Sequence, residues 1–177
     1  MRDVKVYPRL EKAHIGKILD IDRCRYGQKH FPAALRWAER RPWAYNVLIF
    51  RDEVVGYGCV LPVDFFAYNA LKRGEIGEDE LTLKNIPLDW GGASAFYIPS
   101  IAAFPDAERV LTSRLVGYTL GRILQSPLEV FGIAVSHYGE SVAQEVVGME
   151  EQPYSGALLG IDGFQPKLFV KPAFLIH

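Results

Sequence analysis

The segment 95–135 constrains the fold more than any other part of the sequence, because it predicts a strand, a helix and a second strand in succession. AFYIPSIAAF and LEVFGIAV are rich in β-branched and aromatic residues, as strands are. Between them, 109–125 carries apolar residues at helical spacing, namely Val116, Leu120, Ile123 and Leu124. Two strands joined by a crossover helix form a β-α-β unit with parallel strands.

The residues before 64 predict an antiparallel front to this sheet. DVKVYPRL alternates as a strand does, and LEKAHIGKILDIDRCRYG has apolar residues near helical spacing. A second helix, 33–41, follows Pro32 and ends before Pro42. AYNVLIF and VVGYGCVLPV flank the polar turn RDE, which predicts a hairpin.

The remaining segments predict an insertion and a C-terminal pair of strands. Residues 64–94 form an insertion with one short helix, 65–72, and an acidic turn. After the β-α-β unit, 139–147 predicts a helix, and Asp162-Gly163 predicts a tight hairpin between two strands. We therefore expect one α/β domain, 1–177, with a mixed, mostly antiparallel twisted sheet, a central β-α-β unit and helices on both faces.

Composition narrows the partners and the compartment. The chain of 177 residues is 23% charged with a formal net charge of −1, so it has no broad cationic field for nucleic acid or anionic lipid, and we expect neither partner. Cys24 and Cys59 lack metal-ligand spacing, which predicts reduced, buried thiols and no metal site. MRDVKVYPRLEK lacks the apolar core of a signal peptide, and no run is long enough to cross a bilayer, so we expect a cytoplasmic protein.

The order of elements, together with the segment IPSIAAFPDAERVLTSR, resembles the GCN5-related N-acetyltransferase (GNAT) superfamily. In that family a strand ends in the loop V-x-P-x-x-Arg/Gln-Gly-x-Gly-x-Gly/Ala, which opens a helix. Pro105 takes the position of the family's proline and Ser113 that of a small residue, whereas Glu108 and Leu111 depart from its Arg/Gln and from a glycine. Val147-Gly148-Met149 is similar to the leucine-Gly-Phe ending of the family's fourth helix.

The resemblance implies that the protein binds acetyl-CoA or another acyl-CoA and transfers the acyl group to an amine. The pantetheine arm would lie along a splayed strand, where Pro99 has no N–H to give to a ladder. The pyrophosphate would lie at the N-terminus of the next helix, where backbone N–H groups are unpaired. The cofactor-binding residues expected on these two segments are Ser100, Ile101, Ala102, Ala103, Arg109, Leu111, Thr112, Ser113 and Arg114.

Direct attack of an amine on a thioester needs a base for the amine proton and an acid for the leaving thiolate. The family's usual acid is a tyrosine on the fourth helix, and Gln144 stands at that position here. His137 and Tyr138, in the predicted loop SHYGE, are the expected catalytic substitutes, since histidine exchanges protons near neutrality; Ser136 and Tyr154 are alternatives. Candidates for the base are Asp64, Glu75, Glu78, Glu80, Tyr97 and Ser100.

The sequence leaves the acceptor open, as a small-molecule or peptide amine. The oligomeric state, monomer or homodimer, is open as well. A second hypothesis keeps the fold without the chemistry, because the departures at Glu108, Leu111 and Gln144 are also what a non-catalytic binding or interaction module would show.

Overall fold

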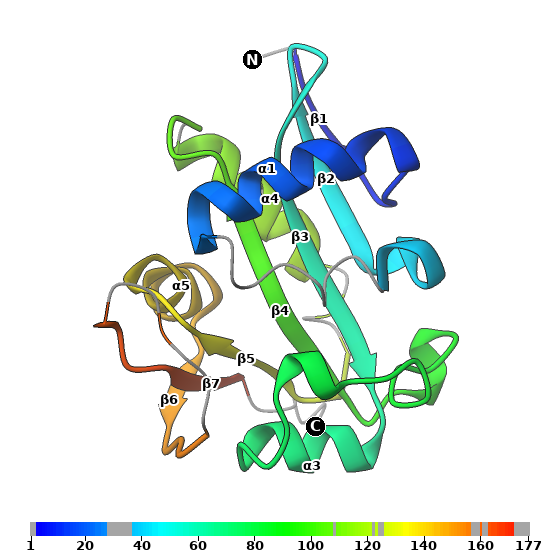
Figure 1. Ribbon diagram of the computed structural model, residues 1–177, viewed down its shortest axis with the longest axis vertical. Helices are drawn as coiled ribbons and strands as arrows, with labels where there is room; N and C mark the ends of the chain where they lie inside the picture. The colour runs from blue at the N-terminus through cyan, green and yellow to red at the C-terminus, as the bar shows by residue number, and fades with distance from the viewer. Residues whose placement is uncertain are drawn as a thin grey trace. The chain divides into compact units, whose positions relative to one another are not determined.

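The computed structural model describes residues 3–27, 37–107, 109–121, 123, 126–156, 160 and 163–171. Its strands are β1 (Val4–Tyr7), β2 (Tyr45–Phe50), β3 (Glu53–Val63), β4 (Ala95–Ala103), β5 (Val130–Ala134), β6 (Glu150–Gln152) and β7 (Lys167–Lys171). Its α-helices are α1 (Ile15–Tyr26), α3 (Phe65–Lys72), α4 (Arg109–Gly121) and α5 (His137–Ser141). The described strands form a seven-stranded sheet in the order β1-β2-β3-β4-β5-β7-β6 (Figure 1).

The chain divides into two compact units. One consists of Met1–Val60 and Ser100–Gly121, and the other of Leu61–Pro99 and Arg122–His177. Strands β3 and β4 therefore each contribute residues to both units. The organisation of 1–177 as a single domain stays a prediction.

The first unit contains the antiparallel front that the sequence predicts. Both β1 and β3 pair antiparallel with β2. The turn between β2 and β3 has positive φ at Arg51 (49°) and Asp52 (62°), as two-residue type I′ turns do. The predicted hairpin is confirmed.

Helices α1 and α4 cover opposite faces of β3 within the first unit. Side chains alternate between the two faces along a strand. Tyr57 contacts Asp22 of α1, whereas the next residue, Gly58, faces Thr119 of α4. Figure 1 shows α1 in front of β2 and β3 and α4 behind them. Helices on both faces, as the sequence predicts, are confirmed in this unit.

Gly58 allows α4 to approach β3 closely, because a Cβ there would lie 2.5 Å from Thr119 Oγ1. Gly58→Ala is therefore expected to lower the free energy of unfolding by about 2 kcal/mol, since an added methyl group must displace buried atoms. Gly117→Ala is the control, because a Cβ at Gly117 meets no atom within 4 Å and alanine favours a helix. Urea unfolding of both variants measures the effect, and a Gly58→Ala protein as stable as wild type would contradict the close packing.

The second unit contains the parallel strand pair. Within it, β4 pairs parallel with β5 over Phe96–Ile98, as the predicted β-α-β unit requires. Strand β7 pairs antiparallel with both β5 and β6. Phe131 of β5 is fully buried, and its ring centroid lies 5.5 Å from that of Tyr68 and 5.1 Å from that of Tyr97. These aromatic side chains form part of the core of this unit.

Helix α5 begins earlier than predicted. Ser136 accepts a hydrogen bond from Gly139 N–H and caps the helix, so that His137 is its first residue. The segment SHYGE is therefore a helix start, and its prediction as a loop is wrong. The chain continues in π-helical geometry over Val142–Val147 and ends at Gly148, whose φ of 67° confirms the predicted left-handed helix stop.

The C-terminal strands differ from the predicted tight hairpin. Strand β7 has β6 as its hairpin neighbour, because the register pairs Glu150 with Val170. The residues described between β6 and β7, namely 153–156, 160 and 163–166, contain no strand. Gly163 has the expected positive φ of 79°, and Asp162 lies outside the described residues.

Two predicted helices differ in extent from what the structure describes. The helix predicted over 109–125 ends at Gly121. In the helix predicted over 33–41, residues 37–40 are helical and 33–36 lie outside the described residues.

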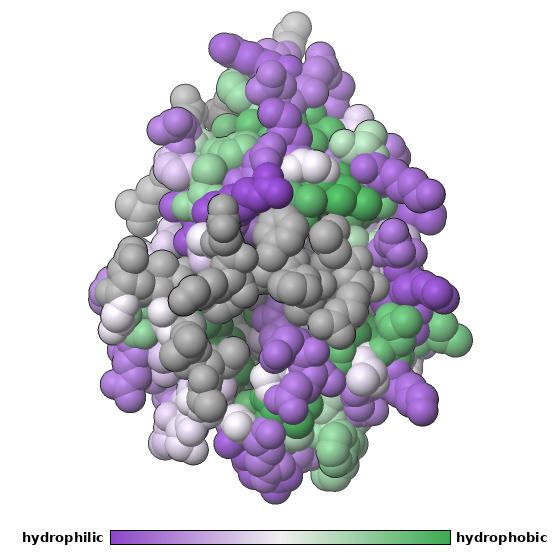
Figure 2. All heavy atoms as spheres, viewed as in Figure 1, coloured by the Kyte–Doolittle hydropathy of each residue, from purple (hydrophilic) through white to green (hydrophobic). Residues whose placement is uncertain are grey.

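Hydrophilic side chains cover much of the face drawn in Figure 2, with smaller apolar areas between them. None of the helices formed by the described residues has the length and hydropathy needed to span a membrane.

Candidate functional site

The N-terminus of α4 is the first part of the candidate site. It follows β4 through a turn in which Phe104 N–H bonds to Val55 O and Ala107 N–H to Phe104 O, at 3.0 and 2.9 Å. The first N–H groups of an α-helix have no partner inside the helix and carry the positive end of its dipole. A thirteen-residue helix that follows a strand through a short turn therefore presents donors for an anionic group.

The side chain of Leu111 is buried within the first unit. It is only 4% exposed and lines a cavity of about 300 Å³ together with Phe50, Val55 and Phe104. Ser113 and Arg114, by contrast, are exposed on α4, and Thr112 is half-buried. The predicted binding residues therefore divide between two faces of the helix, and Leu111 contributes only its backbone to the outer one. Glu108 lies outside the described residues, as does the side chain of Arg109.

The predicted splay of β4 has a visible counterpart in its pairing. The ladder with β5 ends at Ile98, directly before Pro99, although β4 itself continues to Ala103. Proline cannot donate to a ladder, which explains why pairing stops there. In the first unit the Ala103 carbonyl accepts a 2.5 Å hydrogen bond from Arg25 Nε, so this oxygen is already engaged.

A cluster of polar side chains lies against β4 in the first unit, and the sequence did not predict it as a cluster. It consists of Asp22, Tyr26, Tyr57 and Ser100. The Tyr57 hydroxyl donates to Asp22 Oδ1 at 2.5 Å, and Tyr26 Oη lies 3.1 Å from Ser100 Oγ. Ser100 also lies close enough to Tyr57 to lower the pKa of its phenol. Asp22 and Tyr26 are four residues apart on α1, which places both on one helix face.

Burial changes the acidity of two members of this cluster. Asp22 is 4% exposed, and its burial raises the pKa of the carboxyl to about 6. The hydrogen bond from Tyr57 acts in the opposite direction and is the smaller effect. Burial, then the charge of Asp22, raise the pKa of the Tyr57 phenol well above its usual value. Asp22 is thus a carboxyl group that gains and loses its proton close to neutral pH.

One signal in the sequence could have identified Asp22. Ile18 and Ile21 lie on the buried face of α1, and an acidic residue follows at the next position of that face. A carboxylate on an apolar helix stripe is uncommon and needs a buried partner. The partner, Tyr57, is 35 positions away, so its identity could not be read from the helix.

The predicted catalytic residues His137 and Tyr138 begin α5 in the second unit. The His137 side chain is 89% exposed, with Nδ1 at 3.5 Å from Glu140 Oε2 and its ring against that of Phe164. Glu140 also accepts a 2.6 Å hydrogen bond from Lys167, which lowers the pKa of this carboxyl. His137 is therefore accessible to a ligand from solvent, and Tyr138 is half-buried beside it.

The carboxylates proposed as a base from the insertion have structural partners. Asp64 caps α3 by accepting from Ala67 N–H at 2.7 Å, and Glu80 accepts from Gly77 N–H. The remaining two are engaged by side chains. Glu75 pairs with Arg73, and Glu78 accepts a hydrogen bond from Tyr97. The predicted candidate Tyr97 is thus hydrogen-bonded to Glu78. Ser100 belongs to the cluster of Asp22, Tyr26, Tyr57 and Ser100 that lies against β4.

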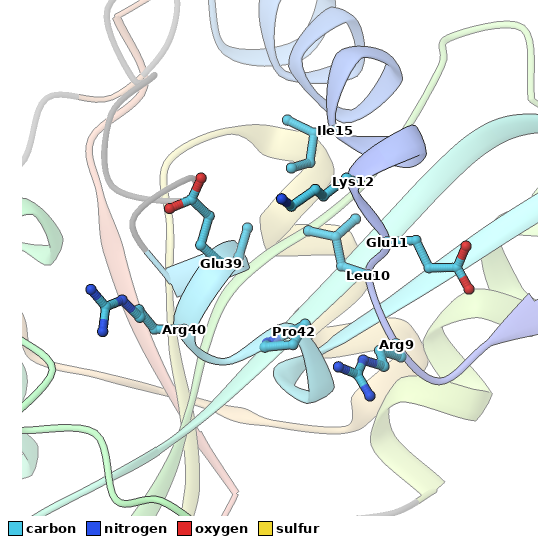
Figure 3. A pocket seen from close by; sticks show the side chains of 9 residues that line it. Arg9, Leu10, Glu11, Lys12, Ile15, Glu39, Arg40 and Pro42 are labelled. Atoms are coloured by element: carbon cyan, nitrogen blue, oxygen red, sulfur yellow. The ribbon is translucent and has the colours of Figure 1, made fainter.

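One hollow in the first unit carries no chemistry that we can assign. A hollow of about 640 Å³ lies between α1 and the helical residues 37–40, lined by charged side chains of both signs and by Leu10, Ile15 and Pro42 (Figure 3).

The described residues contain no cluster of three or more histidine, cysteine or acidic side chains placed to hold a metal. Cys59 is buried but Cys24 is exposed, so the prediction of burial is wrong for Cys24, which lies off the apolar face of α1.

Comparison of the sequence with protein-family models and with curated proteins finds no match. Solved structures, however, share the fold over nearly the whole chain. They include the GphF GNAT-like decarboxylase in complex with isobutyryl-CoA, at a TM-score of 0.70 and 14% identity over 96% of this chain and 98% of that one. Arabidopsis thaliana Naa50 in complex with the bisubstrate analogue CoA-Ac-MVNAL has a TM-score of 0.66 and 10% identity over 96% and 98%.

A third similar structure is mosquito arylalkylamine N-acetyltransferase like 5b, with a TM-score of 0.62 and 14% identity over 95% of this chain and 99% of that one. The class that emerges is an α/β protein with an open, mostly antiparallel sheet and one parallel strand pair. The chain has the GNAT fold, which confirms the fold that the sequence resemblance implies.

Proposed function

We propose that the protein is an acyl-CoA-dependent N-acyltransferase, with acetyl-CoA as the first acyl donor to test. The observation that carries this proposal is the end of the β4 ladder at Pro99, followed by the N-terminus of α4, within a GNAT fold. Similar structures hold a CoA conjugate and isobutyryl-CoA, which supports an acyl-CoA as the ligand of this fold.

The cofactor would be held mainly by backbone groups. The pyrophosphate accepts hydrogen bonds from the first N–H groups of α4, and the exposed Arg114 adds a positive charge within reach of that helix end. Ser113, Thr112 and Arg109 belong to the same two turns. The pantetheine arm lies along Ser100–Ala102, since the Ala103 carbonyl is bonded to Arg25.

The acceptor would be an amine on a small molecule or peptide. One similar structure carries a peptide-containing bisubstrate analogue, and another is named as an arylalkylamine N-acetyltransferase. Gln144 is exposed and has no acidic proton, so His137 or Tyr138 would protonate the leaving thiolate. Both side chains lie at the start of α5, where the cap by Ser136 fixes the backbone.

The competing hypothesis is a GNAT-fold module that binds without catalysis. Gln144 in place of a tyrosine favours it. The burial of Leu111 does not, because this side chain packs inside the first unit and leaves the outer face of α4 open to a ligand.

Calorimetric and thermal-shift titrations with acetyl-CoA and CoA test the proposal. Ligand at 100 times its dissociation constant is expected to raise the free energy of unfolding by about 2.7 kcal/mol. An amine panel with detection of released thiol then measures turnover. No thermal shift and no binding heat would contradict the acyltransferase proposal, whereas binding without turnover would favour the non-catalytic module.

Two substitutions separate binding from chemistry. Arg114→Ala is expected to weaken CoA binding about tenfold, because a charge-assisted contact to phosphate is lost. His137→Ala is expected to lower kcat more than it weakens binding, because its role would be proton transfer. Lys17→Ala, which removes one exposed positive charge from α1, is the control for net charge. Equal, small effects of Arg114→Ala and Lys17→Ala would remove Arg114 from the site.

A further inference from the structure

The cluster that lies against β4 contains a buried acid, Asp22, which has no structural role that we can identify. Within the described residues, Asp22 is paired with the Tyr57 hydroxyl and with no cation. The neighbouring cation on α1, Arg25, donates to the Ala103 carbonyl, and Arg23 pairs with Asp20 on the exposed side of the helix. A buried carboxylate without a counter-ion is costly, and such groups concentrate at functional sites.

The hydroxyl groups of Tyr26, Ser100 and Tyr57 form a path that leads to this carboxylate. Tyr26 and Ser100 are both half-buried and lie at the outer end, whereas Tyr57 is 1% exposed and lies at the inner end. Ser100 lowers the pKa of the Tyr57 phenol, and its hydroxyl can donate to the Tyr57 oxygen. Tyr57 in turn donates to Asp22. Tyr26 can donate to Ser100, so every hydroxyl can point inward.

We infer that Asp22 is the proton acceptor of the acyl transfer and that the hydroxyls of Tyr57, Ser100 and Tyr26 carry the proton to it. This inference rests on the proposed function. Ser100 lies two residues beyond the end of the β4–β5 ladder, in the segment proposed to hold the pantetheine arm. The path therefore starts beside the cofactor arm that ends in the thioester.

The step balances as follows. An ammonium group of the acceptor gives one proton to the outer hydroxyl, each hydroxyl passes its own proton inward, and Asp22 Oδ1 becomes protonated. The neutral amine then attacks the thioester carbon; the C–N bond forms and the C–S bond breaks. The nitrogen loses a second proton, which the leaving thiolate takes up through the acid, and Asp22 returns its proton to solvent.

The charged and titratable groups around Asp22 define what else could titrate with it. Among the residues that the structure describes, these are Arg25 and Tyr26 on α1 and Tyr57 on β3, and β4 adds the uncharged Ser100. Burial raises the pKa of the Tyr57 phenol well above its usual value. Asp22 is therefore the group of this cluster that changes charge near pH 6.

Asp22→Asn is the decisive variant, because asparagine keeps an oxygen for the Tyr57 hydrogen bond but cannot accept a proton. We expect a loss of kcat of about 100-fold or more, with CoA affinity within about twofold of wild type. The acidic limb of the kcat/KM profile, expected near pH 6 in wild type, is lost in the variant. Tyr57→Phe interrupts the path and is expected to lower kcat to a similar extent with Asp22 intact.

Asp20→Asn is the matched control, since Asp20 lies on α1 and pairs with Arg23 away from the cluster. Its rate and pH profile are expected to equal those of wild type. A wild-type enzyme that turns over while Asp22→Asn keeps its rate and acidic limb overturns the inference and leaves the proposed function intact. A wild-type protein that binds acyl-CoA without any turnover overturns both.

Discussion

Leu111→Ala is expected to lower the free energy of unfolding by about 3 kcal/mol and to leave CoA affinity within about threefold of wild type. The side chain is buried at the first turn of α4 and faces Phe50, Val55 and Phe104. Removing three carbon atoms from such a site costs the transfer energy of these atoms and adds to the adjoining cavity. Because the side chain points inward, the backbone donors at the helix end stay in place.

Val110→Ala is the control for this change, since Val110 is 50% exposed on the neighbouring position of the same turn. It is expected to change stability by less than about 0.5 kcal/mol. Denaturant unfolding gives both free energies, and calorimetry gives both CoA affinities. A Leu111→Ala protein with native stability would show that this residue is not part of the core, and a large loss of CoA affinity at native stability would place its side chain in the binding loop.

Asp22→Asn is expected to raise the free energy of unfolding by about 3 kcal/mol at pH 8. Burial raises the pKa of this carboxyl from 3.8 to about 6 in the folded protein, which corresponds to about 3 kcal/mol. The folded state therefore binds the proton more tightly than the unfolded state. The stability that Asp22 contributes is complete below pH 3.8 and is lost as the pH rises through 6.

Asparagine is uncharged at every pH and resembles the protonated aspartic acid, so the variant avoids this loss. The gain in stability is expected to shrink below about 1 kcal/mol at pH 4, because wild type is then largely protonated. Urea unfolding at pH 4, 6 and 8 measures the trend, with Asp20→Asn as a control that shows no such dependence. A gain that is equal at pH 4 and pH 8 would contradict a raised pKa at Asp22.

The sequence and the structure lead to different interpretations of Leu111. Leu111 appears in the sequence as a departure from a glycine position of the cofactor loop, which suggests damage to the site. In the structure it is one of the buried residues of α4, in line with Leu115 and Thr119 at successive turns. The helical spacing of these residues in the sequence also predicts that Leu111 lies on the buried face of the helix.

For the proposed acid, His137 or Tyr138, the sequence does not predict the surroundings that the structure shows. In the sequence His137 and Tyr138 follow a predicted strand, and the structure places them at the capped start of α5. Their exposure and neighbours, Glu140 and Phe164, depend on the packing of α5 and of a segment more than twenty residues later in the chain. Their catalytic role stays a prediction for the His137→Ala experiment.

The sequence by itself determined the order of strands and helices, the parallel pair on either side of α4, the β2–β3 hairpin and the left-handed stop at Gly148. These features depend on local periodicity and on turn residues, both of which act within a few positions of the chain. Only the tertiary structure brought Asp22, Tyr57 and Ser100 together, across 35 and 43 further positions. A helix period shows which face of α1 is buried, but the group it meets, and the burial that moves a carboxyl pKa to about 6, depend on which strands lie beneath it.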